Sequence, residues 1–228
     1  LLIYHEGQRG LNGVDLLELL SCQNFLQRHR FSDEVRGQAL HRPRRWKGKC
    51  EREGYNFRYD AYRFCRKVFA VEHAATTRVG TRLFWVDADV VTFDFIPEGQ
   101  LTAWLPEAIG LSYLGRPVNY HSECGFVGYN LAHPRVMQFI HEFAEQYRTD
   151  LFTQMDEWHD SYIFDRVRER YRDIPQLDLS VGMSGHVFVQ SSLGRYMDHL
   201  KGDRKKDEKT SAKECKIPHI HRYWGNTP

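Results

Sequence analysis

Apolar and polar positions alternate along this chain with two different periods. Short apolar runs are typical of strands, and they predict strands over residues 1–4, 83–86, 109–114, 125–129 and 187–190. Apolar residues spaced three and four positions apart predict helices over residues 14–20, 57–71 and 134–147, and another that opens at the acidic residues 156–160. The order strand, helix, strand is the pattern of βαβ units. We therefore expect an α/β fold with a mostly parallel central sheet flanked by helices.

The run over residues 83–86 leads directly into two carboxylates, Asp87 and Asp89. Its apolar residues predict a strand buried on both faces, and charges at the end of such a strand are costly unless something pairs with them. In an extended segment, residues two positions apart point to the same side, so both acids can face one cation. An isolated Asp-x-Asp is common by chance, but this position favours a site for Mg²⁺ or Mn²⁺.

Length and composition narrow the class of protein. The 228 residues fit one domain, 1–228, with no internal repeat, and a charge-dense stretch predicts a mobile loop at 203–216. The net charge of +2 gives no argument for binding nucleic acid, and no apolar run is long enough for an integral membrane segment. The five cysteines include no Cys-x-x-Cys pair, so we expect a reducing, cytoplasmic location.

Two further groups of charged residues are candidates for a site. Arg63 and Lys67 lie one turn apart on the helix predicted over 57–71 and could bind one anion, although an exposed helix face explains them equally well. Asp156, Glu157 and Asp160 lie where the next helix is expected to begin. Acids in a first helical turn often serve only the helix dipole, so both interpretations stay open.

Two motifs in this order resemble a known family. The sequence Phe-Trp-Val-Asp-Ala-Asp at 84–89 resembles the metal-binding motif of GT-A fold glycosyltransferases, and His199-x-x-Gly202-x-x-Lys205 is similar to the C-terminal motif of glycosyltransferase family 8, which includes glycogenin. The resemblance implies a single GT-A-like, Rossmann-like domain. It also implies that Asp87, Asp89 and His199 bind the metal. The donor-binding residues it implies are Arg63, Lys67, Asp87, Ala88, Gly202 and Lys205.

The chain departs from the family at two positions that bear on the reaction. Glu123 precedes Cys124-Gly125 where the family has Asn before Ala-Gly, and Asp160 precedes Ser161 where the family has Asp-Gln. We expect Asp160 to be the acid at the reaction centre, with Glu123 and Glu157 as alternatives. In an inverting enzyme this acid would be the general base, and in a retaining enzyme it would orient or stabilise the sugar.

The resemblance implies a metal-dependent glycosyltransferase. Its cofactor would be a divalent cation, Mn²⁺ or Mg²⁺, and it would move a sugar from a nucleotide-diphosphate-sugar donor to a carbohydrate or other hydroxylated acceptor. Two alternatives use the same acids. One is a metal-dependent phosphohydrolase or nucleotidyltransferase, and the other is a non-catalytic protein that binds a nucleotide sugar.

Overall fold

The computed structural model describes residues 3–5, 13–15, 28–29, 34–37, 55–77, 80–117 and 120–200. The chain divides into two compact units. The first unit consists of Leu1–Val79 and Met137–Tyr171, and the second consists of Gly80–Val136 and Arg172–Pro228. The expected mobile loop at 203–216 lies outside the described residues, and the single domain over 1–228 stays a prediction.

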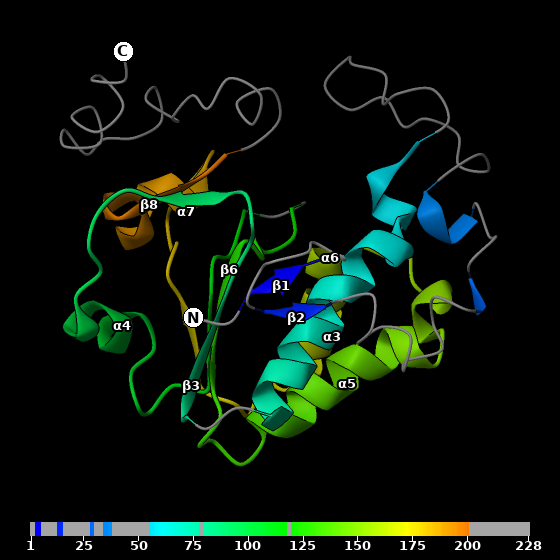
Figure 1. The fold of residues 1–228 in the computed structure, drawn as a ribbon, viewed down its shortest axis with the longest axis horizontal. Coiled ribbons are helices and arrows are strands. Elements are labelled where there is room, and N and C mark those ends of the chain that lie inside the picture. The colour runs from blue at the N-terminus through cyan, green and yellow to red at the C-terminus, as the bar shows by residue number, and fades with distance from the viewer. Residues whose placement is uncertain are drawn as a thin grey trace. The chain divides into compact units, whose positions relative to one another are not determined.

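The first unit is mainly helical in its described part (Figure 1). Its helices are α3 (Ala61–Thr77), α5 (Val136–Arg148) and α6 (Asp160–Arg170), with 3-10 turns η1 (Glu34–Arg36), η2 (Phe57–Tyr59) and η3 (Leu151–Gln154). Helix α3 packs against α6. Phe139 and Phe143 of α5 both contact the ring of Phe164 on α6. Three of the four helices expected from the apolar spacing are therefore confirmed, with shifted ends.

A small parallel sheet completes the described part of the first unit. Its strands are β1 (Tyr4–His5) and β2 (Val14–Asp15). The helix expected over 14–20 is therefore wrong at its first two residues, and residues 16–20 lie outside the described part. A β-branched Val14 fits a strand well, and pairing with β1 outweighs the weak preference of Asp15 for a helix start.

The second unit contains a four-stranded sheet in the order β3-β6-β5-β7. The strands are β3 (Arg82–Val86), β6 (Phe126–Asn130), β5 (Leu111–Tyr113) and β7 (Gln176–Asp178). The pairs β3–β6 and β5–β6 are antiparallel, and β5–β7 is parallel. The mixed α/β class is as expected, but the described sheet is mixed and not mostly parallel. The chain returns from β5 to β6 without a helix in the described part of that connection, and such a return gives antiparallel neighbours.

Burial differs among these strands. All five residues of β6 are buried, whereas β3 is only partly covered and both its ends are exposed. Strand β3 stands at one edge of the described sheet, so it has one strand neighbour where β6 has two. The expectation that residues 83–86 form a strand is confirmed. The expectation that this strand is buried on both faces is wrong, because an edge position leaves part of its surface uncovered.

A two-stranded antiparallel sheet lies next along the chain from β3. Strand β4 (Val90–Thr92) pairs with β8 (Met197–His199), and Val90 stands opposite His199. Residues 187–190, expected to be a strand, form the one-turn helix α7 (Val187–Gln190), which the 3-10 turn η4 (Ser192–Arg195) follows. Three successive apolar residues, 187–189, are too few to show a period, so their pattern fits a buried helical turn as well as a strand.

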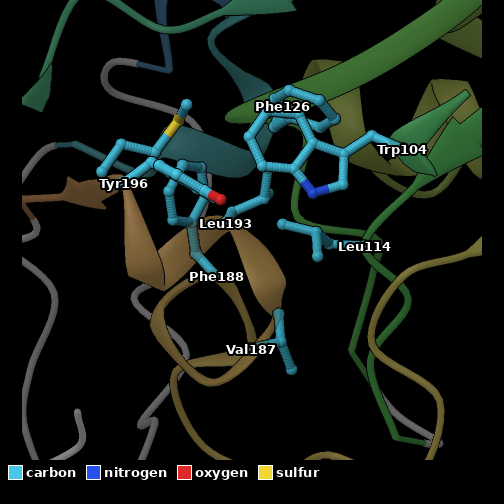
Figure 2. Close-up of a cluster of buried hydrophobic side chains, with 8 residues drawn as sticks. Trp104, Leu114, Phe126, Val187, Phe188, Leu193 and Tyr196 are labelled. Atoms are coloured by element: carbon cyan, nitrogen blue, oxygen red, sulfur yellow. The ribbon is translucent and has the colours of Figure 1, made fainter. Parts of the chain in front are cut away.

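One hydrophobic cluster anchors α7, η4 and β8 within the second unit (Figure 2). Its buried members are Trp104, Leu114, Phe126, Val187, Phe188, Leu193, Tyr196 and Met197. Trp104, the last residue of α4 (Glu98–Trp104), donates a hydrogen bond from Nε1 to Oγ of Ser192 at 2.8 Å. This cluster connects β6 to the segment that ends in β8, and thus supports the strand that carries His199.

Candidate metal centre

Asp87 and Asp89 lie in a tight turn between β3 and β4. The backbone N–H of Asp87 donates to the carbonyl of Gly125 at 3.0 Å, and the N–H of Val90 donates to the carbonyl of Asp87 at 3.0 Å. The indole Nε1 of Trp85 donates to Oδ1 of Asp87 at 2.6 Å. These bonds hold the turn on the end of the sheet, with both carboxyl groups partly exposed.

His199 reaches the same turn because β8 pairs with β4. The backbone N–H of Leu200 donates to the carbonyl of Asp89 at 3.1 Å, so the ladder continues into the turn. Nε2 of His199 lies 2.9 Å from Oδ1 of Asp89 and 4.0 Å from Oδ2 of Asp87. The three expected metal ligands therefore converge, although the chain supplies them from two distant segments.

The three side chains fit a divalent cation. One ligand atom from each lies within 4.8 Å of the other two. Ligands bound to one ion at about 2.1 Å can be about 4 Å apart, so only a small contraction is needed. Two carboxylates and one imidazole suit Mn²⁺ better than Mg²⁺, because Mg²⁺ prefers oxygen ligands throughout. Three protein ligands also leave coordination positions for a substrate.

The ring of His199 is enclosed, with only 7% of its side chain exposed. The ring of Phe188 packs against it edge to face, with centroids 5.6 Å apart. Nε2 of His186 lies 3.1 Å from the backbone oxygen of His199. Gly125 passes so close that a β-carbon there would overlap Nδ1 and Cε1 of the ring. The fold of the second unit thus determines where this imidazole points.

Glu123 lies on the other side of this imidazole. Its Oε1 is 3.1 Å from Nδ1 of His199 and accepts a hydrogen bond from the N–H of Gly125 at 3.3 Å. Its Oε2 forms an ion pair with Arg116, and the residue is only 5% exposed. The sequence marked Glu123 through its departure from the family motif. Nothing in the sequence singled out Arg116, because its partner is known only from the fold.

The other expected catalytic acids belong to the first unit. Asp160 is the first residue of α6 and is 2% exposed. Nζ of Lys67, on α3, lies 2.6 Å from its Oδ2. Burial raises the pKa of the Asp160 carboxyl, but the charges of Lys67 and His159, together with hydrogen bonds from Lys67 and the backbone N–H of Ser161, hold this pKa below its ordinary value. Asp160 is therefore a carboxylate at neutral pH.

Glu157 takes part in a separate network of the first unit. Its Oε1 lies 3.2 Å from the guanidinium of Arg58, and its Oε2 lies 2.9 Å from Nε2 of His159. The structure thus pairs Lys67 with Asp160 and Arg58 with Glu157, which the sequence pattern did not predict.

The remaining expected donor-binding residues are less informative. Arg63 is exposed on α3, and its guanidinium lies 5.7 Å from the centroid of the Phe64 ring. Ala88 is exposed in the turn between the two aspartates. Gly202 and Lys205 lie outside the described residues. Their expected contacts with the donor stay predictions.

Among the described residues, no helix combines the length and the apolar character that crossing a membrane requires. No protein-family model matches the chain, and no curated protein sequence matches it.

Proposed function

We propose that this chain is a metal-dependent glycosyltransferase that transfers a sugar from a nucleotide-diphosphate-sugar donor to an acceptor hydroxyl. The observation that carries the proposal is the convergence of Asp87, Asp89 and His199 within 4.8 Å. The mixed α/β architecture is compatible with the proposed GT-A-like domain. The cytoplasmic location expected from the cysteine pattern stays a prediction.

The three converging residues would hold Mn²⁺ or Mg²⁺. The bound cation would neutralise the charge that grows on the nucleoside diphosphate leaving group. Asp89 and His199 contact each other directly and are the closer pair of ligands, at 2.9 Å. Asp87 is oriented by Trp85 through Oδ1, which leaves its Oδ2 toward His199.

Asp160 is the proposed acid at the reaction centre. Its lowered pKa keeps it ionised at neutral pH, as a group that stabilises a cationic sugar requires, and also makes it a weaker general base than an ordinary aspartate. In an inverting reaction, it would take the proton of the acceptor hydroxyl. In a retaining reaction, it would orient the donor sugar. The ion pair with Lys67 would position the carboxylate in either case.

A metal-dependent phosphohydrolase or nucleotidyltransferase could use the same cation. Enzymes of that kind often hold two metals about 4 Å apart and need additional carboxylates to do so. The described cluster around Asp87 provides two aspartates and one histidine, which suits a single cation. A non-catalytic nucleotide-sugar-binding protein would need the same ligands but would release no product.

One incubation distinguishes these functions. The full chain is mixed with Mn²⁺, an acceptor panel and several nucleotide sugars, and the products are separated by chromatography. Release of nucleoside diphosphate supports sugar transfer. Release of nucleoside monophosphate with sugar phosphate, or of inorganic phosphate, supports the hydrolase, and binding without product supports the binding protein.

Two variants complete this experiment. Asp89→Asn removes a proposed ligand charge and should abolish Mn²⁺-dependent release. Glu107→Gln removes an exposed carboxylate of the same unit and should leave release unchanged. Release that is independent of Mn²⁺, or that survives in Asp89→Asn, would contradict the proposal.

A further inference from the structure

We propose that Glu123 is a positioning residue, which holds the proton of His199 on Nδ1 and so keeps Nε2 free to bind the cation. Arg116 in turn holds Glu123. This inference deepens the proposed function, because it rests on the proposed metal site. It replaces the expectation that Glu123 is a catalytic acid.

Nδ1 of His199 is buried, and no group of the described residues meets full hydrogen-bond geometry with it. Buried polar atoms are nearly always satisfied, so the nearby carboxylate oxygen is the natural partner. That oxygen is Oε1 of Glu123, at 3.1 Å. A small rotation of either side chain would complete the bond.

Both carboxylate oxygens of Glu123 have partners besides His199. Oε2 is engaged by Arg116, and Oε1 also accepts from the N–H of Gly125. A general base needs an oxygen that can reach the acceptor hydroxyl. Both oxygens of Glu123 are engaged, so this carboxylate suits an orienting role and not proton abstraction.

The orientation of the His199 ring also supports this role of Glu123. The two nitrogens of His199 face different carboxylates, with Nδ1 toward Glu123 and Nε2 toward Asp89. A neutral imidazole has one N–H and one lone pair, and only the lone pair binds a cation. Metal-binding histidines usually donate the other N–H to a carboxylate or carbonyl, and this partner sets the tautomer. Glu123 occupies that place.

The structure also indicates how a conservative variant would fail. In Glu123→Gln the side chain has one carbonyl oxygen, and the guanidinium of Arg116, which can only donate, would claim it. The amide NH₂ would then take the place of Oε1 and face Nδ1 of His199. An NH₂ donates to a bare Nδ1, so the ring proton would move to Nε2. That tautomer cannot bind the cation through Nε2.

The first measurement is a Mn²⁺ titration of the wild type and variants, followed by electron paramagnetic resonance. We expect Glu123→Gln to weaken Mn²⁺ binding by about 10- to 100-fold, as loss of such a partner usually does. Glu107→Gln is the matched control and should bind like the wild type. Adding Arg116→Met to Glu123→Gln frees the amide to turn its oxygen toward Nδ1, and should restore part of the affinity. Equal affinity of Glu123→Gln and the wild type would overturn the proposal.

The second measurement needs no metal. Nitrogen-15 spectra of the histidine rings, recorded at a pH where the imidazole is neutral, show which nitrogen carries the proton. We expect Nδ1–H for His199 in the wild type and Nε2–H in Glu123→Gln. Nε2–H in the wild type would overturn the proposal. A wild type with Nδ1–H that binds no Mn²⁺ would instead contradict the proposed function and leave the role of Glu123 standing.

Discussion

Gly125 leaves the space that the ring of His199 occupies, because a β-carbon at this position would overlap Nδ1 and Cε1 of the ring. The same residue accepts the backbone hydrogen bond of Asp87 through its carbonyl. One glycine therefore joins the strand end that carries the aspartates to the imidazole. No other residue type fits here without moving His199.

Gly125→Ala should consequently displace the imidazole and weaken Mn²⁺ binding. We expect at least a tenfold loss of affinity, equivalent to about 1.4 kcal/mol. Isothermal titration calorimetry with Mn²⁺ measures this change in affinity. Gly99→Ala is a matched control, because a β-carbon at Gly99 meets nothing within 4 Å and the residue lies in α4. That variant should bind Mn²⁺ normally and be slightly more stable. Equal binding by both variants would show that the ring does not depend on Gly125.

The ion pair of the partly buried Lys67 with the buried Asp160 predicts a dependence of stability on pH. The pKa of Asp160 is lowered in the folded state. Its contribution to the free energy of unfolding is therefore present above its unfolded-state pKa, about 3.9, and is lost as the pH falls through the folded-state value. The wild type should keep this contribution at neutral and mildly acidic pH.

Lys67→Met should reverse this behaviour. Removing the cation leaves a buried carboxylate unpaired, which should lower the free energy of unfolding by about 3–5 kcal/mol near neutral pH. Burial then raises the folded-state pKa of Asp160, so the deficit should shrink as the pH falls and the acid becomes protonated. Urea unfolding at neutral and mildly acidic pH measures both effects.

Arg166→Met provides the comparison for this variant. Arg166 forms an exposed ion pair with Glu169 on α6, and such pairs contribute less than about 1 kcal/mol. A deficit for Lys67→Met that is equally small, or that does not change with pH, would contradict the role of the pair of Lys67 and Asp160.

The core of the second unit predicts a coupled loss of stability and metal affinity. Phe188 is fully buried in the hydrophobic cluster and packs on the ring of His199. Phe188→Ala should lower the free energy of unfolding by about 3–5 kcal/mol and weaken Mn²⁺ binding, because the cavity loosens the imidazole. Phe95→Ala removes a side chain that is 81% exposed and should change stability by less than about 0.5 kcal/mol. Denaturation and Mn²⁺ titration of both variants provide the test, and unchanged Mn²⁺ affinity in a folded Phe188→Ala would refute the coupling.

Local pattern predicted the elements that are long or strongly periodic. The apolar spacing of α3 and α5 identified both helices, and the apolar run before Asp87 identified β3. It failed at Val187, where three successive apolar residues have no measurable period, and at Val14, where pairing with β1 decides the conformation. The expectation of a mostly parallel sheet was wrong, because strand direction depends on which strands become neighbours. The sequence does not encode that choice locally.

In the candidate site too, local pattern predicted some features, and others depend on the fold. The sequence identified Asp87 and Asp89 as neighbours that could share a cation, but the extended segment expected there is wrong, because the two acids lie in a tight turn between β3 and β4. Their approach to His199 was expected only through resemblance to a family, and the pairing of β4 with β8 now provides a structural reason for it. The partnership of Glu123 with Arg116 arises from tertiary packing, so the sequence identified the acid but not its partner.

The central claim is that Asp87, Asp89 and His199 hold one cation. Electron spin echo envelope modulation of Mn²⁺ added to the full chain tests it directly, because this method detects a nitrogen bound to the ion. We predict the signal of one imidazole nitrogen in the wild type, its disappearance in His199→Gln and weak Mn²⁺ binding in Asp89→Ala. Bound Mn²⁺ without a nitrogen signal in the wild type, or unchanged Mn²⁺ affinity in Asp89→Ala, would contradict the claim.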